Sequence, residues 1–256
     1  MKITVCVKQV PDTTEIKWTE NNTIQREGVE SIMNPYDVWA LETALNIKRQ
    51  IQDTFITVIS MGPNQAESML KKAIALGADE GILLSDKKFA GADTYATSKT
   101  LAQAIKEKIS DFDLIICGQF AIDGDTAQTA PEIAAKLNIP QVTFVEEVKE
   151  IHPDYAIVKR KVENGSEIIE VGFPSLICML LQSGEVSRVY AAGAIKAKNT
   201  DIKVYNADDI GLNAEDAGLR GSPTYVSKAF RPEQREKCRF INDIDELVGE
   251  IGGDNG

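Results

Sequence analysis

The sequence predicts an α/β protein built around a parallel β-sheet. Short apolar runs alternate with segments of helical periodicity through the first two thirds of the chain, a pattern typical of successive βαβ units. At 256 residues the chain is long enough to bury a substantial core. Its formal net charge of −11 argues against nucleic acid or an anionic membrane as the main partner, because binding to phosphate backbones depends on lysine and arginine.

Five apolar runs are expected to form the sheet, and four helices to connect them. The first helix has Asn34 at its N-cap and Pro35 at its first helical position. The later helices begin after Met61-Gly62-Pro63, near Asp93-Thr94 and at Ala130. The five strands are Ile3–Val7, Phe55–Ser60, Gly81–Leu84, Leu114–Cys117 and Val142–Val145.

The pattern changes after Pro140. Tyr155–Val162 and Glu167–Val171 are predicted to form a β-hairpin, and Ser175–Leu181 a further strand. We therefore expect a nucleotide-binding domain over residues 1–181, with the hairpin region at 146–181, and a C-terminal arm over 182–256. The arm has little apolar periodicity between residues 182 and 232, so it is predicted to lie over a partner before a last helix at Ile241–Ile251.

The segment Gly118–Thr129 is the main candidate site. It joins a buried strand to a helix and is rich in glycine, hydroxyl and amide groups. Such a turn can direct backbone N–H groups at a phosphate, with the positive end of the helix dipole behind them. The alternative is a connecting loop in which Asp123-Gly124 makes the turn and Thr126 caps the helix.

Other chemistry is sparse. The single histidine, His152, is predicted to lie in an exposed turn, so no catalytic residue is expected. The acidic residues have no spacing typical of a metal site, and the four cysteines are interpreted as reduced thiols. A second helix start, containing Asp93, Thr94 and Thr97, could face a phosphate or could be an ordinary cap.

Several stretches resemble the β-subunit family of electron transfer flavoproteins, over essentially the whole chain. They are Val5–Asp12, Met33–Asp37, Ser60–Pro63, Ala75–Asp79 and Gly118–Thr129. The resemblance implies a Rossmann-like fold of the adenine-nucleotide hydrolase-like type, and a larger α-subunit as partner. It also implies that a nucleotide lies against Cys6, Asn34, Pro35, Tyr36, Asp37, Met61, Gly118, Gln119, Phe120, Ala121, Ile122, Asp123, Gly124, Asp125, Thr126, Ala127, Gln128 and Thr129.

The opening residues 7–13, Gly124 and the tail Leu219–Phe230 resemble the electron-bifurcating branch, which belongs to anaerobic metabolism. That branch implies FAD as cofactor and NADH as substrate, with Asp93, Thr94 and Thr97 as the candidate NADH-binding residues. It implies ferredoxin or flavodoxin as one electron acceptor. The second electron acceptor is a flavin-dependent dehydrogenase of the acyl-CoA or 2-hydroxyacid type, and electrons reach it through the FAD of the α-subunit.

Two other interpretations stay open. One is a non-bifurcating β-subunit that holds AMP for structural reasons, and the other is a stress-protein-like nucleotide-binding module without a redox role. Residues 185–198 lack the Pro-Arg-Tyr or Pro-Arg-Phe signature common in the family, which leaves the dehydrogenase open. The sequence has neither a signal peptide pattern nor 18 uninterrupted apolar residues, so a cytoplasmic location is expected.

Overall fold

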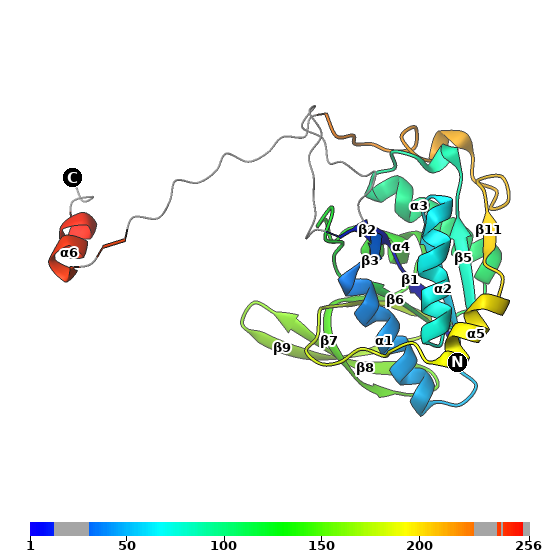
Figure 1. Ribbon diagram of the computed structural model, residues 1–256, viewed down its shortest axis with the longest axis horizontal. Helices are drawn as coiled ribbons and strands as arrows, with labels where there is room; N and C mark the ends of the chain where they lie inside the picture. The colour runs from blue at the N-terminus through cyan, green and yellow to red at the C-terminus, as the bar shows by residue number, and fades with distance from the viewer. Residues whose placement is uncertain (13–30, 228–239, 242, 253–256) are drawn as a thin grey trace.

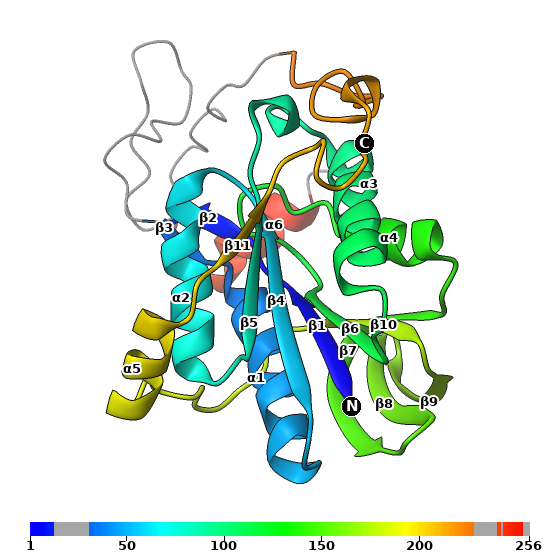
Figure 2. The same cartoon turned by 90° about the vertical axis from the view of Figure 1, so that its right-hand side faces the viewer.

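The computed structural model of the chain describes residues 1–12, 31–227, 240–241 and 243–252. Among these residues, nine strands form one sheet in the order β11-β5-β4-β1-β6-β10-β7-β8-β9, with helices on both faces (Figures 1 and 2). The first seven strands of this order pair in parallel, and β7, β8 and β9 pair antiparallel. The predicted α/β class with a large parallel sheet is confirmed.

All six predicted strands of the parallel part are present. They are β1 (Lys2–Cys6), β4 (Phe55–Met61), β5 (Glu80–Leu84), β6 (Leu114–Gly118), β7 (Gln141–Ile151) and β10 (Ser175–Met179). The predicted hairpin is formed by β8 (Tyr155–Val162) and β9 (Gly165–Gly172). A separate two-stranded sheet pairs β2 (Gln9–Pro11) with β3 (Ser31–Met33). His152 lies in the turn between β7 and β8, where its ring stacks on Tyr155.

The four predicted helices connect the strands. On one face lie α1 (Pro35–Gln50) and α2 (Glu67–Leu76). On the other face lie α3 (Thr94–Ala104), extended by a π-helical turn at Ile105–Ile109, and α4 (Thr129–Leu137). Short 3-10 turns occur at Asn64–Ala66, Lys87–Phe89 and Ala214–Asp216.

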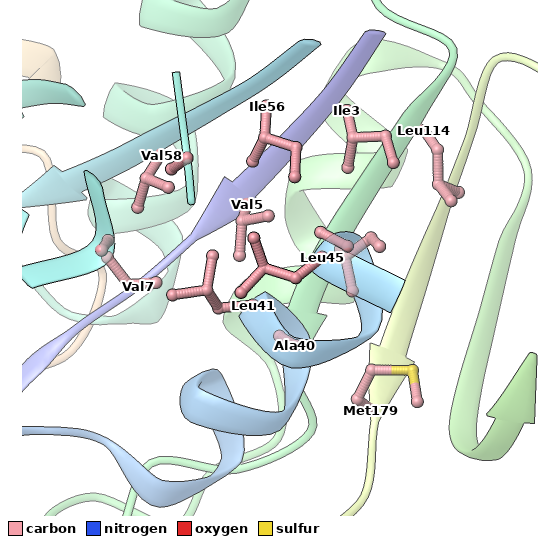
Figure 3. Packing of buried hydrophobic residues seen from close by; sticks show 14 of the residues in the cluster. Ile3, Val5, Val7, Ala40, Leu41, Leu45, Ile56, Val58, Leu114 and Met179 are labelled. Atoms are coloured by element: carbon pink, nitrogen blue, oxygen red, sulfur yellow. The ribbon is translucent and has the colours of Figure 1, made fainter. Parts of the chain in front are cut away.

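The sheet is buried on both faces, which explains why its strands are continuous apolar runs. A hydrophobic core lies on each face of the sheet, and the side chains of β1 alternate between the two. Ile3 and Val5 pack against α1 in one core, and Cys6 lies in the other, beneath α3 and α4. Figure 3 shows Leu41 and Leu45 of α1 pointing toward the side chains of the central strands. This packing fixes the position of α1, whose first turn contributes to the site described below.

The order in which strands are added to the sheet reverses between β1 and β6. After β1 the chain adds β4 and then β5 on one side, whereas β6, β10 and β7 extend the sheet on the other side. A parallel sheet opens a crevice at such a point, outside the carboxyl ends of the two strands. The segments that follow β1 and β6 therefore lie at the expected ligand-binding position.

The structure differs from the expected arm over residues 182–227, and residues 228–232 of the expected arm lie outside the described residues. Within this range α5 (Ala191–Asn199) packs on α2, and β11 (Lys203–Tyr205) pairs with β5 at the edge of the sheet. Ile210 and Leu212 are buried in the core beneath α3 and α4. The sequence signal was weak because small residues make much of this contact: Gly193 lies directly against the carbonyl group of Ala75.

The last helix, α6 (Ile244–Gly252), corresponds to the predicted Ile241–Ile251 segment. Its side chains Ile244, Val248 and Ile251 are exposed, and Figure 1 shows it apart from the sheet. Across the described ranges, no helix combines the length and the apolar character needed to cross a bilayer.

Candidate functional site

The carboxylate of Asp37 joins the segments that follow β1 and end β6. One oxygen accepts a hydrogen bond from the backbone N–H of Lys8 (2.7 Å) and the other from that of Gly118 (3.2 Å). Asp37 lies buried in the first turn of α1. Burial raises the pKa of this carboxyl to about 7, although the two N–H groups, the Asn34 side chain and the Lys8 charge act in the opposite direction. The base of the crevice therefore contains a carboxyl group that titrates near neutral pH.

Gly118 permits this contact because it has no side chain. A Cβ atom at this position would overlap Oδ1 of Asp37 and would lie 2.7 Å from Cβ of Tyr36. Any larger residue would have to displace either the carboxylate or the first turn of α1. The glycine is thus required by close packing at the crevice.

Asn34 occupies the predicted N-cap position of α1, but its side chain serves the neighbouring loop. Its Nδ2 donates to the carbonyl oxygen of Phe120 (2.7 Å), and its Oδ1 accepts from the N–H of Ile122 (3.2 Å). The residue is almost completely buried. Asn34 therefore fixes the first part of the segment 118–129 from a helix that precedes it by more than 80 residues.

Gln119 and Phe120 are held on the inner side of the same segment. The N–H of Gln119 donates to Met179 (2.9 Å), and its Oε1 accepts from the N–H of Phe144 (2.6 Å). Phe144 has a φ of 58°, a left-handed conformation that is unusual for an aromatic residue. The rings of Tyr36, Phe120 and Phe144 pack edge to face, with centroid distances of 5.4 and 6.0 Å. Gln119 is thus a support for the loop that faces the protein interior.

The remainder of the segment is an exposed loop that leads into α4. The N–H groups of Gly124 and Asp125 bond to the carbonyl group of Ala121, which forms the predicted turn at Asp123-Gly124. Asp125 and Ala127 have φ values of 51° and 55°. Gln128, which follows Ala127, is in the right-handed region (φ −100°, ψ −37°). A left-handed residue beside a right-handed one turns successive N–H groups toward the same side, an arrangement that suits an anion.

The N-cap residue of α4 is Gln128, so the alternative assignment of this role to Thr126 is wrong. The Gln128 side chain accepts a hydrogen bond from Thr94 Oγ1 (3.1 Å) and, among the described residues, caps no N–H of its own helix. In the first turn of α4, the N–H groups of Thr129 and Ala130 are therefore available to an anionic ligand, whereas Pro131 has no N–H.

A cation lies beside this loop. Nζ of Lys8 is 2.7 Å from both carboxylate oxygens of Asp123, and the two side chains are 48% and 28% exposed. Sequence reasoning did not single out Lys8 as a site residue. Its position two residues after β1 could have indicated it, because β1 borders the crevice.

The second candidate helix start lies next to the loop. Asp93 caps α3, since one carboxylate oxygen accepts from the N–H of Ala96 (3.0 Å), and the other accepts from the hydroxyl of Thr224 (2.7 Å). Thr94 contacts the loop through Gln128, and Thr97 is half-buried. The structure thus brings Thr94 to the segment 118–129 and uses Asp93 to hold the chain near Thr224.

Cys6 and Met61 flank the crevice at the ends of β1 and β4. Cys6 is in register with Cys117, which is in register with Cys178 on β10. A hydrogen bond from its own S–H to Cys6, together with burial, raises the pKa of the Cys117 thiol well above its usual value, and burial raises that of Cys178 to about 12. Met61 lines a mainly apolar cavity of about 410 Å³ together with Pro63, Ser85, Phe89 and others.

The fold and this crevice define an α/β protein with an exposed loop at the switch point of a parallel sheet. Residues 21–210 match the electron transfer flavoprotein domain family. The chain is 45% identical over 254 residues to the caffeyl-CoA reductase-Etf complex subunit CarD of Acetobacterium woodii, which covers 98% of this chain and 96% of that protein.

Two further relatives have similar coverage. The electron transfer flavoprotein subunit beta of Megasphaera elsdenii is 46% identical over 241 residues, covering 92% of this chain and 89% of that protein. Protein FixA of Azorhizobium caulinodans is 40% identical over 266 residues, covering 98% and 94% respectively. The chain belongs to the electron transfer flavoprotein β-subunit family.

Proposed function

We propose that this chain is the β-subunit of an electron-bifurcating electron transfer flavoprotein. In this role it pairs with an α-subunit, binds FAD at the segment 118–129 and accepts a hydride from NADH. One electron then passes to a low-potential acceptor such as ferredoxin or flavodoxin, and the other passes through the FAD of the α-subunit to a flavin-dependent dehydrogenase. The similarity to CarD, which is named as part of a reductase-Etf complex, supports the assignment to this branch.

The observation that carries the nucleotide assignment is the uncapped start of α4 at the switch point. The pyrophosphate of FAD would be held by the N–H groups that follow Asp125 and Ala127, and by those of the first turn of α4. The hydroxyl groups of Thr126 and Thr129 adjoin these N–H groups in the sequence. The residues present fit a phosphate-bearing group, because the loop is exposed and its base is fixed by Asn34 and Asp37.

Lys8 supplies the positive charge that such a ligand needs. The chain carries a formal net charge of −11, and Asp123 and Asp125 lie within the loop itself. The ammonium group of Lys8 neutralises Asp123 and would thereby lower the repulsion between the loop and an incoming phosphate. When bound, FAD supplies the redox chemistry, whereas the protein supplies binding, orientation and electrostatics.

NADH is proposed to bind at the start of α3. Thr94 is one hydrogen bond away from Gln128, so a dinucleotide at this helix start would lie beside the one held by the loop. The second hydroxyl group in this proposal is that of Thr97, which is half-buried on α3. The competing explanation is that Asp93 merely caps the helix and fastens the chain at Thr224.

The α-subunit is proposed to cover the exposed apolar residues of the C-terminal region. Tyr190, Tyr225 and Val226 are each more than three quarters exposed. The apolar residues of α6 are exposed as well. A contiguous partner surface would remove these side chains from water, which favours association.

An AMP-holding β-subunit is the second candidate, because the same loop geometry suits the single phosphate of AMP. The nucleotides released from the purified heterodimer separate the two proposals. Two flavins per heterodimer support the bifurcating assignment, whereas one flavin with one AMP supports the non-bifurcating one. A heterodimer with neither a second flavin nor AMP would contradict the nucleotide site itself.

A further inference from the structure

The carboxylate of Asp37 is fully engaged by the protein backbone. Its two oxygens accept from two N–H groups that are 29 and 81 residues distant in the sequence, and only 6% of the residue is exposed. Both oxygens of this side chain are therefore occupied by bonds to the main chain. Its role is structural and differs from that of the loop residues that would contact a nucleotide.

The two N–H groups belong to the two strands that border the crevice. β1 and β6 pair in register as far as Cys6 and Cys117, and the chain segments separate beyond that pair. Lys8 lies two residues past the end of β1, and Gly118 ends β6. The carboxylate thus connects the two segments at the point where the sheet no longer does.

We infer that Asp37 is a positioning residue, whose buried carboxylate sets the separation of the ends of β1 and β6 and so the placement of the loop 118–129. The expected effect on nucleotide affinity rests on the proposed function. The contact between Asp37 and the two N–H groups does not depend on it. The same carboxylate also places Lys8, whose ammonium group reaches Asp123 of the loop. Both walls of the crevice are therefore held by one side chain.

The ionised form of Asp37 is the form that can accept both hydrogen bonds well. Three residues face it: Lys8 on the β1 side, with its N–H and its ammonium group, Cys117 of β6, and Asn34, whose side chain is neutral. The thiol of Cys117 is hydrogen-bonded to Cys6. Because the pKa of Asp37 lies at about 7, acidification below neutrality adds a proton and weakens one of the two bonds. This weakening concerns a local opening that leaves Asp37 buried, and it is distinct from global unfolding, which brings the carboxyl into water and is opposed by its protonation. Nucleotide affinity should consequently fall as the pH drops through 7.

Asp37→Asn tests the inference, because the amide keeps the size of the side chain but presents a donor to one of the two N–H groups. Asp113→Asn is the matched control. Asp113 accepts a hydrogen bond from the N–H of Lys2 (2.6 Å), which makes the same kind of contact at the opposite end of β1. Both variants are made in the full chain together with any subunit that co-purifies with it.

Two measurements are made on each protein between about pH 5.5 and 8.5. Amide hydrogen exchange, corrected for its intrinsic pH dependence, reports protection at Lys8 and Gly118, and titration with AMP and with FAD reports affinity. Asp37→Asn is expected to lower protection at both amides by about tenfold or more, because a hydrogen bond to an ionised group is lost. It should lower nucleotide affinity to a similar degree and abolish the pH dependence of both quantities, while Asp113→Asn retains the wild-type behaviour.

Unchanged protection at both amides in Asp37→Asn would overturn the inference, and so would equal losses in the two variants. If Asp37→Asn does not fold, the wild-type protein alone decides: protection at Lys8 and Gly118 must fall as the pH drops through about 7. A wild-type protein that shows this change in protection but binds neither nucleotide would support the positioning role and refute the proposed function.

Discussion

Asn34 donates a hydrogen bond across the crevice to the carbonyl oxygen of Phe120, at a distance of 2.7 Å. The amide that should cap α1 is used instead to hold the segment that follows β6. Replacing it by alanine removes this bond and also the bond from Ile122. Because Asn34 is buried and both bonds are partly buried, their loss should cost about 1–3 kcal/mol in loop ordering.

Asn34→Ala is therefore expected to weaken nucleotide retention by about 5- to 160-fold. The amount of nucleotide that remains with the protein after gel filtration measures this. Asn46→Ala is the matched control, since Asn46 lies on the exposed side of the same helix. Retention that falls equally in both variants would show that the loss came from α1 as a whole.

Gly118→Ala should destabilise the protein, whereas Gly124→Ala should not. The methyl group would overlap Asp37 at the first position, but it meets nothing within 4 Å at the second. Overpacking of this kind typically costs about 1–3 kcal/mol. Denaturant unfolding of both variants measures the difference. Equal free energies of unfolding would mean that the residues around Gly118 rearrange to accept the methyl group without loss of stability.

Gly124 also carries a prediction about the ligand. Its φ is not in the left-handed region, so the backbone conformation gives no reason for a glycine there. We predict that Gly124→Val leaves the free energy of unfolding unchanged but reduces nucleotide affinity, because a side chain blocks close approach of the phosphate. Wild-type affinity in this variant would show that the nucleotide does not approach at residue 124.

Thr97→Val should raise the apparent KM for NADH while the flavin content stays constant. The substitution keeps the size of the side chain and deletes a hydroxyl that the proposal assigns to NADH. Stopped-flow reduction of the flavin at varied NADH provides the measurement. Thr94→Val is the comparison: it also loses the bond to Gln128 and should therefore lower flavin content too. Unchanged saturation in Thr97→Val would mean that NADH binds elsewhere.

Asp37 should make the stability of the ligand-free protein depend on pH near neutrality. Its pKa is raised from 3.8 to about 7, so between these values the folded chain holds a proton that the unfolded chain releases. The free energy of unfolding should increase as the pH falls from about 8 to about 5, by at most about 1.4 kcal/mol per pH unit.

Denaturant unfolding across this pH range measures the effect, with Asp37→Asn and Asp113→Asn beside the wild type. Asp113→Asn leaves Asp37 in place and should keep the wild-type slope, whereas Asp37→Asn should lose it. Parallel curves for all three proteins would show that Asp37 is not the group that titrates.

The sequence predicted the framework of the site because the strong signals are local. Apolar runs locate strands, and Asn34-Pro35 locates the start of α1. The bonds from Asn34 to Phe120 and from Gly118 to Asp37 could not be predicted, because each spans more than 80 residues and depends on the order of strands in the sheet. The same limit applies to β11, a three-residue strand that is specified by its neighbour β5 more than by its own pattern.

The segment 118–129 of this chain is proposed to hold a flavin. The most direct test is the number of flavins and AMP molecules per heterodimer in the wild type and in Asp125→Leu/Thr126→Leu, with Glu163→Leu/Asn164→Leu at the exposed turn between β8 and β9 as the control. We predict two flavins in the wild type and the control, and one in the loop variant, with folding intact in all three. Two flavins retained in a correctly folded loop variant, or one flavin with AMP in the wild type, would contradict it.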